Sequence, residues 1–360
     1  MKRPRAFRGR GRAFTQAVIP KAAGLSVAAE VNPVGPGCTY EVWDMSTMAL
    51  SRRAFLAGTS AAVVAARGAR GQDSEGDTPA MAEENVINIP ANYYQHFDAD
   101  YALDVPEEGF GGWQKATLPF SRDHTAVVVM HAWDAGTREA FPGWWRCVPY
   151  IPRANRICAE VFPPLLEAVR ASDLPLFHVV GGGDYYKELP GYKHALELAG
   201  PAPDAPERVA SDSVRDKLHA FRQEHTFVGL ENADDVKRGF DRLDFAPNSE
   251  PLGDEGVAEN GHQLCALCNE KGVNHLIYVG FAINWCLLLS PGGMAEMAHK
   301  YGVMCSAIRQ ATTAVENKES ARQEWCKELA LWRVALAFGF VFDVDDFVAA
   351  LKDRGSVKGA

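Results

Sequence analysis

The sequence predicts an α/β protein with a doubly wound, three-layer fold, in which a mostly parallel sheet lies between two layers of helices. Four short apolar runs have the length and composition of strands that are buried on both faces. The segments between them have the spacing of helices, and a helical crossover is the connection that a parallel sheet requires. The predicted strands are residues 126–133, 174–180, 275–282 and 303–308.

The first two predicted strands flank a bent helix. Residues 126–133 (AVVVMHAW) form one continuous apolar run. In residues 154–172 apolar side chains recur at helical spacing, and the pair Pro163-Pro164 must bend or restart that helix. The strand at 174–180 ends in three glycines followed by an aspartate. An acidic residue would repel phosphate, so we interpret the glycines as a flexible loop.

The second half of the chain repeats the alternation of helix and strand. The run HLIYVGFA is the clearest strand, and a glycine after each of two helical segments is typical of a helix end. The predicted helices are residues 206–224, which we expect to be exposed, 260–272, 294–302 and 319–339.

Composition and charge restrict the partners of the chain. It has 360 residues, 47% of them hydrophobic, and a net charge of −9, which does not suggest a nucleic-acid binder. Of its eight cysteines, Cys38 lies in the leader, and an odd set of seven in a large core predicts free, mostly buried thiols. Cys265 and Cys268 lie in a predicted helix without a second metal-binding pair. We therefore expect no nucleic-acid partner, no metal and no cofactor, and a homo-oligomer is possible; the expectation of a small-molecule substrate comes from the family resemblance described below.

Residues 48–71 have the pattern of an export signal. Arg52 and Arg53 precede an apolar run of small residues that is too short to anchor the mature protein in a membrane. The stretch SRRAFL resembles a twin-arginine signal and predicts a periplasmic or extracellular protein. Residues 1–47 read as an over-extended reading frame, although their arginine-rich composition also suits organelle targeting. We expect a linker and N-terminal arm at 72–119, one domain at 120–350 and a tail at 351–360.

A cysteine follows the strand HLIYVGFA. In an open α/β sheet, ligands bind beyond the carboxyl ends of the strands. Asn284 can cap the helix that starts there, which would place Cys286 in its first turn. Backbone N–H groups at a helix start favour a thiolate and can hold an oxyanion. The spacing alone leaves two interpretations open: a nucleophile, or a core cysteine.

The stretch YVGFAINWCLLLSPGGMAEMAHKYGVMCSAIRQATTAVE resembles the isochorismatase-like cysteine hydrolases, in which G-x-x-x-x-x-C precedes a helix. The likeness extends over residues 124–345, more specifically in its second half. It implies a doubly wound fold and hydrolysis of a C–N bond in a small amide, or of a vinyl ether, by an aspartate, a lysine and a cysteine. Carried onto this chain, the nucleophile is Cys286.

The other two members of that triad are replaced. His131 stands where the family has its aspartate, with Asp134 three residues later. The stretch that should contain the lysine offers Asp254 and Glu255 instead. We therefore predict an atypical triad of Cys286, His131 as the base and Asp134, because imidazole titrates near neutral pH. The predicted substrate contacts are Trp133, His178, Tyr185 and Asn284.

Two further interpretations remain open. Loss of both the aspartate and the lysine is what a catalytically silent member would show, and such a protein would bind a small molecule or a partner without turnover. A metal-dependent hydrolase could use His131, Asp134 and His178, although their spacing matches no metal motif. The plainer alternatives are a strand-end histidine for His131 and a loop cap for Asp134.

The export signal leads to the first testable prediction. Replacing both Arg52 and Arg53 by lysine should abolish export of a fused reporter, because lysine keeps the charge but lacks the planar guanidinium. The matched control replaces Arg8 and Arg10 by lysine in the leader and should leave export unchanged. Mass spectrometry of the exported protein should find an N-terminus near residue 72, and one well before Ser51 would contradict the prediction.

Overall fold

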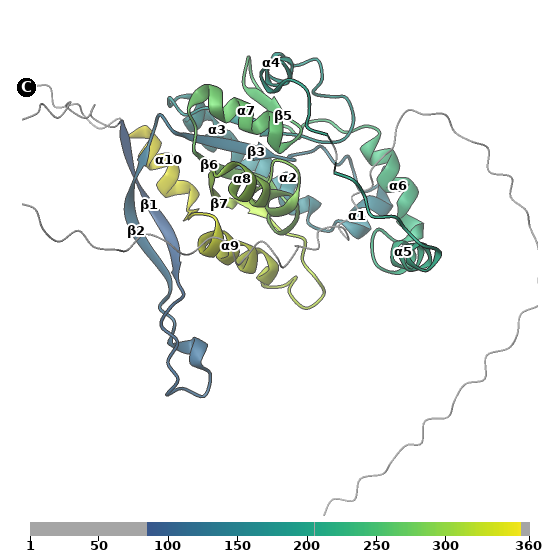
Figure 1. Cartoon of the computed structure of the whole chain (residues 1–360), viewed down its shortest axis with the longest axis horizontal. Helices are drawn as coiled ribbons and strands as arrows, with labels where there is room; N and C mark the ends of the chain where they lie inside the picture. Colours follow the sequence, from purple (N-terminus) through teal and green to yellow (C-terminus); the bar gives the residue numbers. More distant parts are fainter. Residues whose placement is uncertain (1–84, 205, 354–360) are drawn as a thin grey trace, which may run out of the picture. The chain divides into compact units, whose positions relative to one another are not determined.

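The computed structural model describes residues 85–204 and 206–353, so the predicted leader, the signal segment and most of the linker lie outside the described residues. Within these ranges, eight strands form one sheet with the order β2-β1-β8-β7-β6-β3-β4-β5 (Figure 1). The strands are β1 (Val86–Gln95), β2 (Gly112–Ser121), β3 (Thr125–Met130), β4 (Leu176–Val179), β5 (Gly256–Ala258), β6 (His275–Phe281), β7 (Met304–Thr313) and β8 (Val341–Phe342).

Six strands, adjacent in the order β5-β4-β3-β6-β7-β8, are parallel to one another. Strands β1 and β2 form an antiparallel hairpin, and β1 pairs antiparallel with β8. The chain runs outward from β3 to β4 and β5, and then returns to build β6, β7 and β8 on the other side of β3. The direction of winding therefore reverses between β3 and β6. This confirms the predicted doubly wound, mostly parallel sheet.

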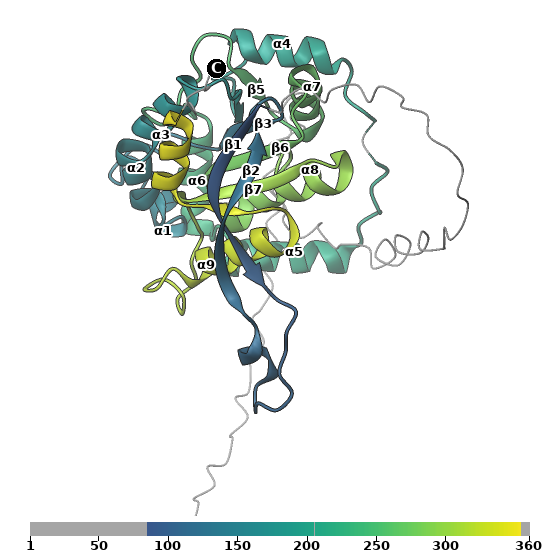
Figure 2. The same ribbon diagram turned by 90° about the vertical axis from the view of Figure 1, so that its left-hand side faces the viewer.

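Helices cover both faces of the sheet (Figures 1 and 2). One core lies between the sheet and α4, α7, α8 and α9, and a second core lies between the sheet and α2, α3 and α10. No helix of the described residues is long and apolar enough to cross a membrane. The helices are α1 (Pro142–Cys147), α2 (Ile151–Glu160), α3 (Phe162–Arg170), α4 (Pro190–Ala199), α5 (Ser213–His225), α6 (Leu230–Phe240), α7 (Gly261–Lys271), α8 (Met294–Tyr301), α9 (Trp325–Ala337) and α10 (Val344–Lys352), with the short turns η2 (Pro106–Gly109) and η3 (Ile283–Leu287).

Several element boundaries differ from the predicted ones. The first predicted strand stops at Met130 because His131 takes a left-handed backbone conformation, with φ of 49°. The two prolines restart the helix, since α2 ends at Glu160 and α3 begins at Phe162. β7 continues past the predicted end to Thr313. The hairpin, the short strands β5 and β8, and helices α1, α4, α6 and α10 were not predicted.

The β1–β2 hairpin extends well beyond the rest of the sheet. Its strands pair along their full ten-residue length, yet β1 pairs with β8 only through Ala91 and Asn92. The hairpin therefore projects past the helices, as Figures 1 and 2 both show. The sheet begins at Val86, so the predicted N-terminal arm contributes its two antiparallel strands. We call residues 96–111 the arm tip.

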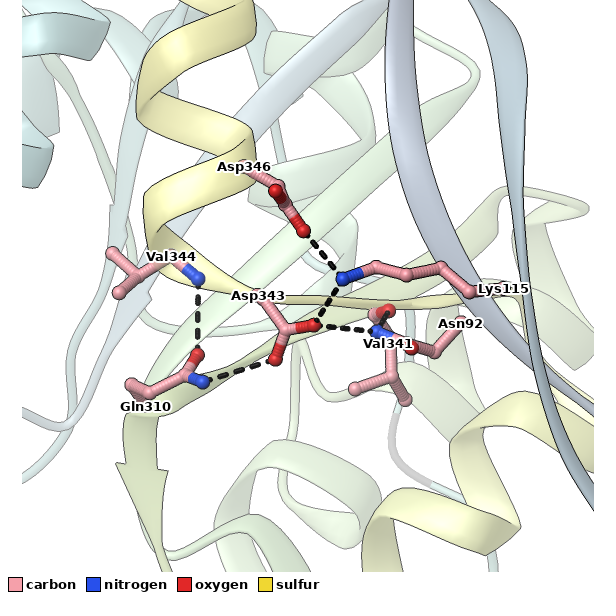
Figure 3. Close-up of polar contacts among 7 residues, drawn as sticks. All are labelled: Asn92, Lys115, Gln310, Val341, Asp343, Val344 and Asp346. Carbon is pink, nitrogen blue, oxygen red and sulfur yellow. Dashed lines mark hydrogen bonds and ion pairs between the residues drawn. The ribbon is translucent and has the colours of Figure 1, made fainter.

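One carboxylate joins the hairpin to the C-terminal part of the sheet (Figure 3). Asp343 accepts hydrogen bonds from Lys115 at 2.8 Å, from Asn92 at 3.1 Å and from Gln310 at 3.0 Å. Lys115 also binds Asp346 on α10 at 2.5 Å. Burial alone would raise the pKa of Asp343, but these hydrogen bonds lower it to about 2.

This network leads to the second prediction. Replacing Asp343 by alanine should lower the free energy of unfolding by about 1–3 kcal/mol, because three donors lose their shared acceptor. The pKa of Asp343 is held below its ordinary value of 3.8, so its contribution is complete above that pH and disappears as the pH falls towards 2. Urea unfolding at several pH values measures both effects.

The control is Asp346→Asn, which removes a more exposed carboxylate that pairs with Lys115. It should change the free energy of unfolding by less than about 1 kcal/mol. Equal losses for the two variants would contradict a central role for Asp343.

Candidate active site

The candidate site lies where the winding of the sheet reverses, between the carboxyl ends of β3 and β6. Met130 and Gly280 are paired across these strands. A Cβ atom at Gly280 would lie 2.0 Å from the carbonyl oxygen of Met130, so the strands can approach this closely only because residue 280 is glycine. His131 directly follows β3, and Cys286 lies in η3 directly after β6. In doubly wound sheets this reversal point is the usual ligand site.

The Cys286 side chain is partly buried and packs against the core of the sheet. Burial raises the pKa of this thiol above its ordinary value, while hydrogen bonds with the Ser290 side chain and with the backbone of Ala282 and of Cys286 itself act in the opposite direction. The net direction is upward, so the expectation of a lowered pKa is wrong. The helical segment at η3 is too short for a substantial macrodipole, and burial dominates.

Asn284 does not cap the helix as predicted. Ala282 occupies the cap position and has no side-chain hydrogen bond to the turn. Asn284 instead donates from Nδ2 to the carbonyl of Val315 at 2.8 Å and accepts the Val315 N–H at 3.0 Å. It thereby fixes the Cys286 segment to the chain that follows β7. Its predicted contact with substrate stays a prediction.

Two hydroxyl groups near Cys286 were not predicted. Ser290 lies one helical turn after the cysteine, a spacing that the sequence could have shown. Burial raises the pKa of Tyr150, which lies at the start of α2, and the negative charge of a nearby Cys286 thiolate would raise it further. The two residues are 136 positions apart, and no sequence pattern links them.

His131 points into an aromatic environment. Its ring stacks on Trp133 with centroids 4.4 Å apart and is hydrogen-bonded to the backbone of Val180. Burial lowers the pKa of His131 to about 3. The expectation that it titrates near neutral pH is therefore wrong. It is a neutral imidazole at pH 7, and a weak base.

A small cavity brings together four of the predicted residues, His131, Trp133, His178 and Tyr185. Trp133 Nε1 donates to the Tyr185 hydroxyl at 2.9 Å, and Phe245 packs on Tyr185 with ring centroids 4.8 Å apart. Cys286 does not line this cavity. The structure thus groups the histidines with the aromatic side chains and leaves the thiol outside that group.

His178 belongs to a buried charge network. Its Nε2 lies 2.8 Å from Glu255, which also binds Arg170 at 2.6 Å. Burial alone would raise the pKa of Glu255, but the hydrogen bonds from His178 and Arg170 lower it to about 2. Burial lowers the pKa of His178, so a neutral imidazole donates to this carboxylate. Glu255 is therefore an occupied ion-pair partner and not a ready base for Cys286.

Asp134 has the local role of a loop cap. One carboxylate oxygen accepts the Gly136 N–H at 2.8 Å, and the other binds Arg242 at 2.6 Å. The predicted role of Asp134 and of His131 beside Cys286 stays a prediction. Across the described ranges, no group of three or more His, Cys, Asp or Glu side chains could hold a metal ion.

The third prediction concerns the reactivity of this thiol. Because burial raises the Cys286 pKa, alkylation by iodoacetamide at pH 7 should be slower than that of glutathione. The rate should continue to rise with pH beyond the ordinary thiol pKa of about 8.5. Peptide mass spectrometry follows this residue separately from the other cysteines.

Ser290→Ala is the informative variant. It removes a hydrogen bond that lowers the pKa, so alkylation of Cys286 should become slower still at neutral pH. Reaction of the unmodified chain at pH 7 faster than glutathione would contradict the raised pKa.

Comparison with known proteins gives structural matches only. No family model matches the chain, and no curated protein matches it. A cysteine hydrolase from Pseudomonas syringae pv. phaseolicola 1448A is 13% identical, with 66% of this chain and 96% of that chain covered and a TM-score of 0.36. An isochorismatase-like hydrolase from Alkaliphilus metalliredigens is 17% identical, with 63% of this chain and 98% of that chain covered and a TM-score of 0.36. N-carbamoylsarcosine amidase from Thermoplasma acidophilum is 14% identical, with 62% of this chain and 97% of that chain covered and a TM-score of 0.31. No functional conclusion follows from similarity at this level.

Proposed function

We propose that this chain is a cysteine hydrolase that cleaves a C–N bond of a small amide-type molecule, with Cys286 as the nucleophile. One observation carries the proposal. Cys286 lies directly beyond the carboxyl end of a central parallel strand, at the point where the winding reverses, and its sulfur is hydrogen-bonded by Ser290 and by the backbone. The sequence pattern from Gly280 to Cys286 supports the same assignment.

The chemistry would proceed in two displacements. The sulfur attacks the amide carbonyl carbon, the C–N bond breaks, and the leaving amine takes the proton that the thiol gives up. Water then attacks the thioester, which releases the carboxylic acid and restores the thiol. The net change is the addition of one water molecule across the C–N bond.

The surroundings of the thiol suit a reaction that starts from the neutral form. The raised pKa keeps Cys286 protonated at neutral pH, so its proton is available for the leaving amine. The Tyr150 hydroxyl is also kept protonated, because burial raises the Tyr150 pKa. A protonated phenol is a hydrogen-bond donor that could stabilise an oxyanion. Because the thiolate is the stronger nucleophile, turnover should increase as the pH rises.

A second candidate function is binding of a small molecule without turnover. It is favoured by the separate placement of the predicted base, since His131 lies in the aromatic cavity and Cys286 does not line it. Asp134 and Glu255 are likewise engaged by Arg242 and Arg170. In this case Cys286 would be a cysteine that is partly buried against the core.

The fourth prediction separates these functions. In a screen of small amides, Cys286→Ala should abolish any turnover that the unchanged chain shows, because the variant lacks the proposed nucleophilic sulfur. Tyr150→Phe should lower kcat by roughly a hundredfold, as expected when one oxyanion donor is lost. Thermal unfolding of both variants checks that the fold is intact.

His131→Ala is the comparison variant. A general base would reduce the rate by about a hundredfold when removed, but a pKa of about 3 makes His131 too weak for this role. We therefore expect a loss of less than about tenfold. Full turnover in the Cys286→Ala variant would show that Cys286 is not the nucleophile. Tight ligand binding with no turnover in the unchanged chain would favour the second candidate.

We also infer that the protein acts after export. The arginine pair at residues 52 and 53 and the short apolar run that follows support a twin-arginine route to the periplasm or the outside of the cell.

A further inference from the structure

The arm tip is an ordered loop that presents apolar side chains to solvent. The backbone N–H of Asp100 binds the carbonyl of Pro106 at 3.0 Å, and the Asp100 carboxylate accepts the Ala102 N–H at 2.9 Å. Yet Phe97 is 74% exposed and Tyr101 is 87% exposed. A loop that is fixed by its own hydrogen bonds while it exposes large apolar groups is pre-organised for a binding partner.

The arm tip is also strongly acidic. Residues 96–111 contain five acidic residues and no lysine or arginine: Asp98, Asp100, Asp104, Glu107 and Glu108. A surface that combines exposed aromatic rings with this charge fits a partner surface that is apolar in its centre and basic at its border.

Helix α5 has that complementary character. None of its residues is buried, although Asp212 caps its start by accepting the N–H groups of Val214 and Arg215. Val214, Leu218 and Phe221 are all at least 60% exposed. Their spacing places them on one face of the helix, so α5 exposes the type of apolar stripe that helices normally bury.

Basic side chains border this stripe on both sides. At 100° per residue, Lys217 lies on one side of the stripe beside the acidic Glu224, and Arg215 and Arg222 lie on the other side, each within about 90° of its centre. Asp216 lies on the opposite face of the helix. The stripe and its border are therefore complementary to the arm tip in both polarity and charge.

The arm tip and α5 of one chain are not in contact. The hairpin leaves the sheet beside α9 and α10, whereas α5 lies beside α6 (Figure 1). No hydrogen bond, ion pair or ring contact between the two is found within residues 85–204 and 206–353. A second copy of the chain offers each surface the partner that its own chain does not.

We propose that two copies of this chain associate through the arm tip of one copy and the exposed face of α5 of the other. Each copy carries both surfaces, so a two-fold arrangement uses the contact twice. Tyr101 and Phe97 pack on the stripe formed by Val214, Leu218 and Phe221, and the acidic residues of the tip pair with the basic border. This association is independent of the proposed chemistry at Cys286.

The fifth prediction tests this contact by charge reversal. Analytical ultracentrifugation of the full chain should show a dimer whose dissociation constant rises with salt. Lys217→Glu combined with Arg222→Glu should weaken dimerisation by at least about tenfold, because acidic groups then face the acidic tip. Asp104→Lys combined with Glu108→Lys in the arm tip should have the same effect. All four residues are exposed, and circular dichroism checks that the variants fold.

Combining both reversals in one chain should restore dimerisation, since a basic tip then meets an acidic helix. The matched control, Lys318→Glu with Arg322→Glu, makes the same net charge change at exposed positions before α9 and should leave the dimer intact. A chain that stays monomeric at all concentrations would overturn the proposal. The proposal would also be overturned if neither charge reversal changed the dissociation constant of the dimer, or if the combined variant stayed monomeric.

Discussion

The close approach of β3 and β6 is the constraint on which the rest of the site depends. Gly280 leaves room for the carbonyl of Met130, and the two strands can then remain adjacent up to their carboxyl ends. A side chain at this position would push the strands apart and separate the segments that follow them. The position of Cys286 therefore depends on the absence of a side chain at Gly280 as well as on the turn η3 that contains the cysteine. The left-handed backbone of His131 ends β3 at the same level and turns its ring away towards the aromatic cavity.

Burial determines the electrostatics of this region. It raises the pKa of Cys286 and of Tyr150, and it lowers the pKa of His131 and of His178. All four groups are therefore neutral at pH 7. The charges nearby are already paired, as in Arg170 with Glu255 and Arg242 with Asp134.

The central sheet could be predicted from the sequence because its strands are buried on both faces. Continuous apolar runs such as 126–133 and 275–282 have few alternative structures. The hairpin could not be predicted in this way, because β2 is largely exposed. Strands β5 and β8 could not be predicted either, because they have only three and two residues. The candidate site likewise contains residues that could be predicted from the sequence and residues that could not. Cys286 follows a recognisable strand, whereas its neighbour Tyr150 comes from α2, and the burial that shifts the pKa of His131 exists only in the folded chain.

The anchoring of the hairpin has a consequence for how the molecule is assembled. The residues that hold it, Asn92 and Lys115, contact Asp343, which lies more than two hundred positions later in the sequence. Strand β1 reaches the sheet only through β8, which is itself close to the C-terminal end of the described chain. During synthesis, the first two strands must therefore wait until almost all of the polypeptide has left the ribosome. A chain that stops before residue 341 could still form the central parallel strands, but its hairpin would have no edge to join.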